Sequence, residues 1–523
     1  MPARSSATLH APVGMVCSPD HLASSAGVAI LRRGGSAADA AVAASAVLAV
    51  TSQHMCGMGG DLFALVHDGT APPTALAAVG RAGSGADAAA LRAEGHTAVP
   101  LRRDVRSSTV PGCVDGWLAL HARHGRLPLA DVLEPARRYA ADGFPASPLL
   151  ALATLLIVDV AGADDMLPPG GLRPGDRVRR PSVAATLEAV ATGDRDAFYL
   201  GAFGDGLMQL GGGLYTKDDL ARSQAEWVTP LRARAWGHDV WTVPPPSQGY
   251  LALAAAWIAD GLDLPGDPDD PLWAHLLSEA ARAAGHDRLE VLHEGADGEA
   301  LLAEDRLAAR RGLVDRGRRS VPPAPDGDGG TIHLCAVDGD GMGVSLIQSN
   351  AADWGCHVVV PGTGIFLHNR GIGFRLDPGH PAELGPGRRP PHTLSPALVT
   401  GPDGSLTAVL GTMGGDIQPQ VVLQLLARLL HLGQSPGAAV HAPRWTLGEG
   451  GFTSWEHPGP QATTIEADAP EEWAEGLARL GHRVVRAAPG ANVGHANAIV
   501  VGSDGVLAGA ADPRALTGGA CGY

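Results

Sequence analysis

The sequence has little of several features that would have assigned it to a class directly. Six cysteines stand at positions 17, 56, 113, 335, 356 and 521, with no Cys-x-x-Cys pair. Cysteines so few and scattered exclude a disulfide framework and are typical of reduced, buried thiols, so we expect a cytoplasmic protein. Lys217 is the only lysine, and the formal net charge is −16. This acidic balance argues against nucleic-acid and anionic-membrane partners.

Long apolar runs and common cofactor motifs are also missing. The amino-terminal residues lack the apolar run of a signal peptide, and the stretch LALATLLIVDVAG is too short to cross a bilayer. There is no GxxxxGK[ST] phosphate loop, no HExxH, no GxSxG and no kinase signature. His121 and His124 lack a nearby third ligand, and His293-Glu294 lacks a second histidine at the required spacing. We therefore expect no metal and no cofactor.

The residue pattern predicts helices first and strands later. Ser18 should cap a helix that ends at Gly34-Gly35, and Ser36, with Asp39 as its capping-box partner, should open a second, almost wholly apolar helix. Breakers follow at LPGDPDDP and at VPPAPDGDGG, which ends at Gly330. Short alternating strands come after it, and no regular βαβ alternation is visible. A helix-rich part and a strand-rich part, joined at 321–330, indicate the α+β class.

A predicted hairpin places Thr331 in an unusual position. Asp338-Gly339-Asp340-Gly341 is a strong turn signal between two strand-forming runs. A four-residue loop pairs Val337 with Met342 and sets Thr331 opposite Gln348. Ser349 and Asn350 then lie at the same end of the hairpin as Thr331.

Threonine becomes an effective nucleophile when it starts a chain, because its own α-amine then serves as the base. That amine has a pKa near ~7.7–8, so a useful fraction is neutral at physiological pH. Thr331 would gain such an amine if the bond after Gly330 were cut, and the preceding Pro/Asp/Gly tract suits cleavage. Taken alone, however, a threonine that begins a strand after a loop is ordinary.

Ordered motifs along nearly the whole chain resemble the γ-glutamyltransferase family of N-terminal-nucleophile (Ntn) hydrolases. The matching segments are GMVCSPDHLASSAGVAILRRGGSAADAAVAA, CGMGGDLFAL, VPGCVDGWLALHARHGRLPLADVLEPARRYAADGF, VPPPSQG, GTIHLCAVDGDG, GTGIFLHNRG, RRPPHTLSPALV, GTMGGD and ADPRALTGGACGY.

The resemblance implies a fold, a processing step and a set of catalytic residues. The fold is a four-layer αββα sandwich with two antiparallel-rich sheets between helical layers. Autocleavage between Gly330 and Thr331 would give a large subunit, 1–330, and a small one, 331–523, that stay associated as one Ntn-hydrolase unit. Ser349 falls where the family has a second threonine that supports the nucleophile. Gly414-Gly415 match the pair whose backbone amides form the oxyanion hole, as expected of a glycine turn before a helix.

The substrate pocket departs from the family pattern. Val79 stands where the family has its glutamyl-binding arginine, and Arg81 is two places away. A glycine of NRGIGF replaces the aspartate that grips the substrate amine, and the usual Ser-Ser pair is His392-Thr393. The family's asparagine after the supporting threonine aligns with Ala351, although Asn350 is adjacent. Glutamate recognition therefore looks lost, and the candidate substrate contacts are Arg81, Asn350, His392 and Thr393.

Three functional hypotheses remain open. The leading one is a self-processing, Thr331-dependent hydrolase or acyltransferase for a small acyl compound, with water or an amine as acceptor. Amide bonds are the expected target, and some relatives cleave a C–C bond beside a carbonyl. The alternatives are a true glutathione hydrolase with a rearranged pocket and an unprocessed, non-catalytic binding protein. The expected partners are the substrate and the two fragments with each other, with a homodimer or a dimer of heterodimers left open.

Overall fold

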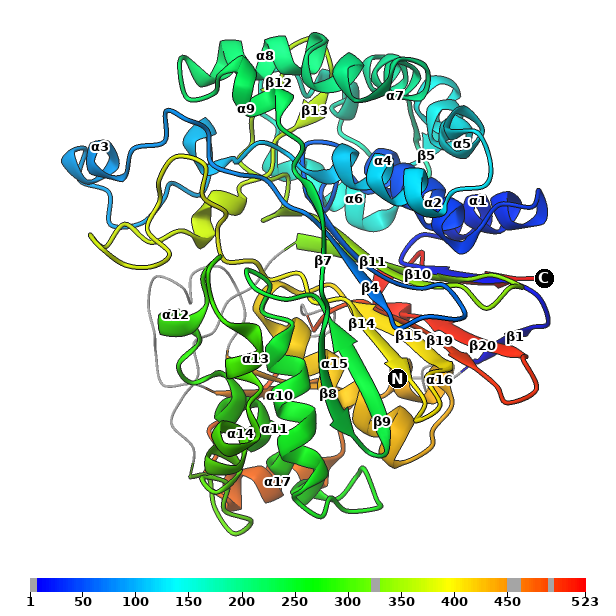
Figure 1. Ribbon diagram of the computed structural model, residues 1–523, viewed down its shortest axis with the longest axis vertical. Coiled ribbons are helices and arrows are strands. Elements are labelled where there is room, and N and C mark those ends of the chain that lie inside the picture. Colours follow the sequence, from blue (N-terminus) through cyan, green and yellow to red (C-terminus); the bar gives the residue numbers. More distant parts are fainter. Residues whose placement is uncertain (1–6, 321–329, 449–461, 488–492) are drawn as a thin grey trace.

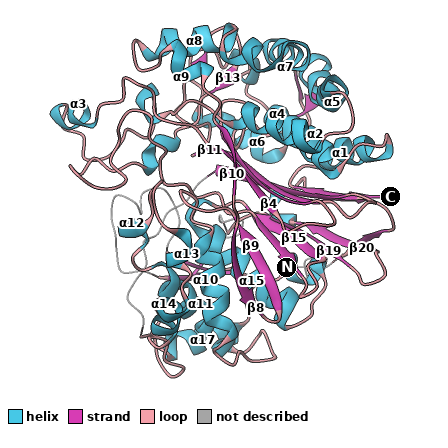
Figure 2. Cartoon of the chain, in the orientation of Figure 1, coloured by secondary structure: helices cyan, strands magenta, loops and turns pink. Residues whose placement is uncertain are grey.

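The computed structural model describes residues 7–320, 330–448, 462–487 and 493–523. Two antiparallel sheets lie face to face, and helices cover the outer face of each (Figure 1). Figure 2 shows the same arrangement, with the strands between two groups of helices. This is the four-layer αββα sandwich that the family resemblance implies.

Within the described residues, each main sheet has seven strands, all paired antiparallel. The first sheet runs in the order β21 (Gly519–Gly522), β2 (Met15–Ser18), β10 (Gly330–Val337), β11 (Gly343–Ala351), β3 (Asp61–His67), β4 (Thr74–Ala78) and β7 (Ala225–Val228). The second runs in the order β1 (Leu9–Ala11), β20 (Leu507–Ala511), β19 (Ala496–Val501), β15 (Leu406–Thr412), β14 (Ala397–Thr400), β9 (His238–Thr242) and β8 (Leu231–Ala235).

Short strands decorate the periphery. They are β5 (Phe144–Pro145) with β6 (Arg177–Val178), β12 (Val359–Val360) with β13 (Ile365–Phe366), and the set β16 (Trp445–Leu447), β17 (Thr463–Ile465) and β18 (Val484–Arg486).

The helices form two groups, one for each sheet (Figure 1). The group over the first sheet contains α1 (His21–Arg32), α2 (Ala37–Thr51), α4 (Cys113–His124), α5 (Leu129–Asp142), α6 (Pro148–Ala153), α7 (Pro181–Tyr199), α8 (Ala202–Gly211) and α9 (Lys217–Ala221), with α3 (Ala88–Ala93) to one side. The group under the second sheet contains α10 (Tyr250–Asp260), α11 (Pro271–Gly285), α12 (Arg288–Val291), α13 (Gly298–Leu301), α14 (Glu304–Arg311), α15 (Gln418–Leu426), α16 (Pro436–His441) and α17 (Glu471–Arg479). Across the described ranges, none of the helices has both the length and the apolar character needed to span a membrane.

The first two helices follow the sequence prediction with one correction. Asp20, not Ser18, caps α1: its carboxylate accepts from the Leu22 amide at 2.9 Å, while Ser18 ends β2. The strand extends that far because Ser18 pairs with Gly519 of the carboxyl-terminal strand, a contact remote in sequence. Ser36 and Asp39 form the expected capping box at the start of α2.

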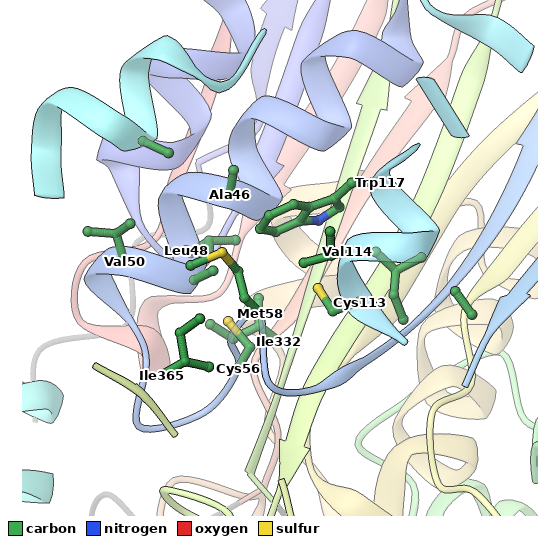
Figure 3. Packing of buried hydrophobic residues seen from close by; sticks show 14 of the residues in the cluster. Ala46, Leu48, Val50, Cys56, Met58, Cys113, Val114, Trp117, Ile332 and Ile365 are labelled. Atoms are coloured by element: carbon green, nitrogen blue, oxygen red, sulfur yellow. The ribbon is translucent and has the colours of Figure 1, made fainter. Parts of the chain in front are cut away.

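Helix α2 is buried along its whole length because it lies between the first sheet and the outer helices α4 and α5. Figure 3 shows this layer, where Trp117 of α4 lies among small and branched apolar side chains. Ile332 of β10 belongs to the same cluster, so that side chain faces the helices. Because side chains alternate along a strand, Thr331 and His333 face the second sheet instead.

Strands from before and after residue 330 interleave in both sheets. In the first sheet β10 pairs with β2, β11 with β3, and β21 with β2. In the second, β14 pairs with β9, and β20 with β1. The two parts joined at 321–330 are thus one folded unit, and the helix-rich part supplies strands to each sheet.

The predicted hairpin exists, but its register differs by one residue. Val337 pairs with Gly343 rather than Met342, and Ile332, not Thr331, pairs with Gln348. The loop is longer because the Asp338 carboxylate accepts from the amides of Asp340 and Met342, both at 3.0 Å. A bulge lies at the opposite end of the hairpin from the loop, between Gly330 and Ile332, so that Gly330 pairs with Ala351.

Candidate active site

Thr331 and Ser349 meet at the end of the β10–β11 hairpin. Their hydroxyl oxygens lie 3.0 Å apart, a hydrogen bond in which either can donate. Both side chains are buried, and Ser349 also accepts from the Ala351 amide at 2.8 Å. The second hydroxyl therefore holds the first in a fixed position on the face between the two sheets.

The Gly414-Gly415 turn lies toward the same end of the sandwich. Strands β11 and β15 lie against each other in the facing sheets and run in the same direction. Gly343 packs against Leu406, and further along the Ser345 hydroxyl donates to the Leu410 carbonyl at 3.0 Å. Continuing along both strands brings Ser349, with its hydrogen-bonded neighbour Thr331, toward the turn that follows β15.

This glycine turn has backbone geometry that leaves amides available. Gly414 has φ +130° and Gly415 φ +59°, immediately before a short 3-10 turn and helix α15. Within the described residues, neither amide donates a hydrogen bond. Two neighbouring free N–H groups at a helix start can stabilise a negatively charged oxygen. This geometry is compatible with the oxyanion hole that the family resemblance implies, and that role stays a prediction.

Asp61 lies directly across from Ser349 on the neighbouring strand β3 and faces the same side. Its carboxylate accepts from the amides of Gly80 at 3.0 Å and Gly112 at 3.1 Å, and His392 Nε2 lies 3.2 Å away. Burial by itself would raise the pKa of Asp61, but His368, His392 and the Gly80 amide lower it to about 2. Asp61 is consequently a carboxylate at neutral pH.

His392 is a neutral imidazole in this setting. Burial and the nearby charge of Arg370 lower its pKa to about 3, against the opposing effect of Asp61. A neutral ring that donates from Nε2 to Asp61 leaves Nδ1 as an acceptor, and Nδ1 has no hydrogen-bond partner among the described residues. The ring also packs edge-on against Phe63, with centroids 5.1 Å apart.

Arg370 brings a positive charge to the paired hydroxyls. Its Nη2 donates to the Ser349 hydroxyl at 3.4 Å, and its Nη1 donates to the Thr393 hydroxyl at 3.1 Å. Burial lowers the pKa of Arg370 to about 10, although Asp61 and Asp416 act to raise it, so the guanidinium stays protonated at neutral pH. Thr393 therefore reaches the cluster through Arg370.

Two of the predicted substrate contacts do not join this cluster. The Asn350 side chain is on the opposite face of β11 from Ser349, and its Nδ2 donates to the Gln53 carbonyl at 3.0 Å. Arg81 is held elsewhere, by Glu294 at 2.7 Å and by the Gly387 carbonyl at 3.2 Å. Glu294 is remote in sequence, so the pattern around Arg81 gave no sign of this partner.

A cavity of about 380 Å³ adjoins the segments that carry Arg370 and Thr393 without containing either residue. Phe374 and Arg389, which lie four residues from Arg370 and Thr393 respectively, line it together with Glu294. In the described part of the chain, no group of three or more His, Cys, Asp or Glu side chains is arranged to hold a metal ion.

Sequence reasoning missed Asp61, His368 and Arg370. Asp61 and Arg370 stand inside the segments CGMGGDLFAL and GTGIFLHNRG, which were noted for their family likeness alone. A charged residue directly after a glycine-rich turn was the available signal for Asp61. For Arg370 no comparable signal was present: in NRGIGF only the glycine that replaces the family's aspartate was considered, and not the arginine before it.

Comparison with known proteins assigns the chain to a family. A family profile described as gamma-glutamyltranspeptidase matches residues 23–522. The oxamate amidohydrolase proenzyme of Klebsiella pneumoniae is 37% identical over 98% of each chain. The glutathione hydrolase-like YwrD proenzyme of Bacillus subtilis is 35% identical over 96% of this chain and 97% of its own. Among solved structures, cephalosporin acylase from Bacillus halodurans superimposes with a TM-score of 0.91, at 33% identity over 100% of this chain and 98% of its own.

Proposed function

This chain belongs to the γ-glutamyltranspeptidase family of Ntn hydrolases, and we propose that it is a self-processing amidohydrolase with Thr331 as its nucleophile. The observation that carries the proposal is the 3.0 Å contact between the Thr331 and Ser349 hydroxyls at the start of a strand. Three relatives of comparable length bear names that describe them as proenzymes, which supports processing.

The proposed first reaction is cleavage of the chain itself. The Thr331 hydroxyl attacks the Gly330 carbonyl, an ester C–O bond replaces the peptide C–N bond, and the proton passes to the Thr331 nitrogen. Water then hydrolyses the ester, which leaves a Gly330 carboxylate and a free Thr331 amine. The interleaved strands would hold fragments 1–330 and 331–523 together after this cut.

The same groups then act on the substrate. The freed amine accepts the proton of the Thr331 hydroxyl as that oxygen attacks the substrate carbonyl. The amides of Gly414 and Gly415 stabilise the charged oxygen that forms, and the amine returns the proton to the leaving nitrogen. Water releases the acyl group in a second attack. Transfer to an amine acceptor and cleavage of a C–C bond beside the carbonyl are alternatives that this acyl-enzyme route permits.

The substrate is proposed to be a small acyl amide rather than glutathione. The most similar relatives include an oxamate amidohydrolase, and the family's glutamyl-binding arginine is absent from its usual position. A glutathione hydrolase is the second candidate, favoured by the name of the Bacillus subtilis relative. We place the enzyme in the cytoplasm because all six cysteines are free thiols. The paired fragments are its proposed minimal unit.

Electrophoresis of the wild type and of Thr331→Ala tests the proposal. We expect two wild-type bands of roughly 34 and 20 kDa, by each fragment's share of the 53.3 kDa chain, and a single band for the variant. Both wild-type fragments should elute together under native conditions and separate in denaturant. A wild type that stays one band and turns over no amide would leave only the non-catalytic binding protein. Turnover of a γ-glutamyl anilide as fast as the best small amide would favour the glutathione hydrolase.

A further inference from the structure

Arg370 is a buried cation that has no carboxylate partner within the described residues. It is 5% exposed, and no acidic oxygen there lies within 4.0 Å of its guanidinium. The two nearby acids are engaged elsewhere: Asp61 by His392 and two backbone amides, and Asp416 by Arg288 at 2.8 Å. A buried charge without a counter-ion is costly, and burial favours pairing with an anion.

The hydrogen bonds of the guanidinium lead to the nucleophile. Arg370 donates to the hydroxyls of Ser349 and Thr393, and Ser349 in turn contacts Thr331. An arginine has five N–H donors in a planar fork, and two hydroxyls use only part of them. The fork matches a carboxylate, which can accept two of its N–H groups at once.

The spacing limits how far such a carboxylate can be from the reacting carbonyl. The contacts through the Ser349 oxygen put Arg370 Nη2 no more than about 6.4 Å from the Thr331 hydroxyl oxygen. A reacting carbonyl carbon lies about 3–3.5 Å from the nucleophile, and a carboxylate about 2.8 Å from its guanidinium. A short acyl group fills the remaining gap, with the carboxylate on the carbonyl carbon or one or two carbons away.

We propose that Arg370, supported by Thr393, binds a carboxylate of the acyl group, so that the substrates are monoamides of short dicarboxylic acids. This inference rests on the proposed amidohydrolase function. It assigns anion recognition to a position distinct from Arg81, whose charge Glu294 already neutralises. Because the guanidinium is buried, a neutral acyl group, which forms no ion pair with it, gains much less from it than a carboxylate does.

Matched substrate pairs test the proposal through ammonia release. Oxamate, malonamate and succinamate are each compared with the corresponding diamide, which has the same shape without the charge. For at least one pair we expect the wild type to favour the monoamide about 10- to 100-fold in kcat/KM, as for hydrogen bonds to a charged group. Arg370→Met should abolish that preference, and Arg370→Lys should keep part of it. Arg375→Met, at an exposed arginine paired with Asp377, is the control and should keep all of it.

Two outcomes would overturn the proposal. One is a wild type without preference in any pair. The other is an Arg370→Met enzyme that loses the same factor on monoamide, diamide and a neutral phenyl ester, because Arg370 would then merely position Ser349. If Arg370→Met fails to fold, calorimetry of monoamide and diamide binding to the wild type decides, and equal affinities refute the site.

The underlying function is read out separately. Mass spectrometry reports acylation of Thr331 by neutral phenyl acetate, and electrophoresis reports chain cleavage. Selective monoamide binding without either signal would refute the amidohydrolase and keep the anion site. Both signals without selective binding would refute the anion site and keep the amidohydrolase.

Discussion

Removing the hydroxyl of Ser349 should slow autocleavage in addition to lowering the stability of the fold. In Ser349→Ala, Thr331 loses its 3.0 Å partner and the buried Ala351 amide loses its 2.8 Å acceptor. An orphaned buried amide costs about 1–3 kcal/mol of folding free energy. The freed rotation of the nucleophile should slow cleavage about 10- to 100-fold, which is about 1.4–2.7 kcal/mol in the barrier.

Ser345→Ala is a matched control on the same strand and the same face. Its hydroxyl donates to the Leu410 carbonyl and contacts His333 Nε2, both at 3.0 Å, so its loss should cost similar stability and leave cleavage unchanged. Ser349→Thr restores a hydroxyl and should restore cleavage. The assay is a time course of band conversion on a gel after synthesis, with urea midpoints measured in parallel. Equal cleavage rates in Ser349→Ala and Ser345→Ala would refute the role of Ser349.

Two further predictions concern the glycine turn and acid pH. Gly414→Ala should lower amide turnover about 100-fold, because a Cβ there meets Ile417 Cγ1 at 2.7 Å and displaces the turn. Gly433→Ala, also at positive φ but in open space, is the control and should leave turnover unchanged. Equal kinetics in both variants would contradict the oxyanion assignment. Stability to urea should fall as pH drops below 6.5, by up to about 1.4 kcal/mol per pH unit for each buried neutral histidine, since the unfolded chain binds protons that the folded one does not. Burial is the main cause of the lowered pKa values, which are about 3 for His54, His333 and His392; unchanged urea midpoints between pH 7 and 5 would contradict this.

Local signals predicted the elements well because their causes are local. The capping box of Ser36 and Asp39, the buried apolar run of α2 and the glycine turn before α15 each depend on residues within a few positions. The family likeness added the layer order, which no local pattern contains. Ser18 was assigned as a cap wrongly because its strand pairing with Gly519 lies at the other end of the chain.

The site was harder to predict because it depends on contacts between distant segments. Asp61 comes before the two breaker segments and Arg370 after them. The pairing of β3 with β11 sets Asp61 beside Ser349, and Arg370 reaches Ser349 from a separate segment. The pairing of Arg81 with Glu294 likewise has no local signature. By residue type alone, Arg81 and Arg370 are equally suited to bind an anion. Their partners in the structure distinguish them, because Arg81 is paired with Glu294 and the Arg370 guanidinium donates only to hydroxyl side chains among those described.

The register of one hairpin determines whether the nucleophile has a supporting hydroxyl. Directly opposed residues of an antiparallel pair share a face, so Thr331 opposite Gln348 would have faced the helices, where Gln348 contacts Ser45. The additional loop residue pairs Ile332 with Gln348, so that Thr331 takes the opposite face, which is the face of Ser349. Asp338 closes the longer loop through two backbone amides, so its replacement by Ala should disturb cleavage from the far end of the hairpin. A variant with intact stability and normal cleavage would contradict this dependence of the site on the loop.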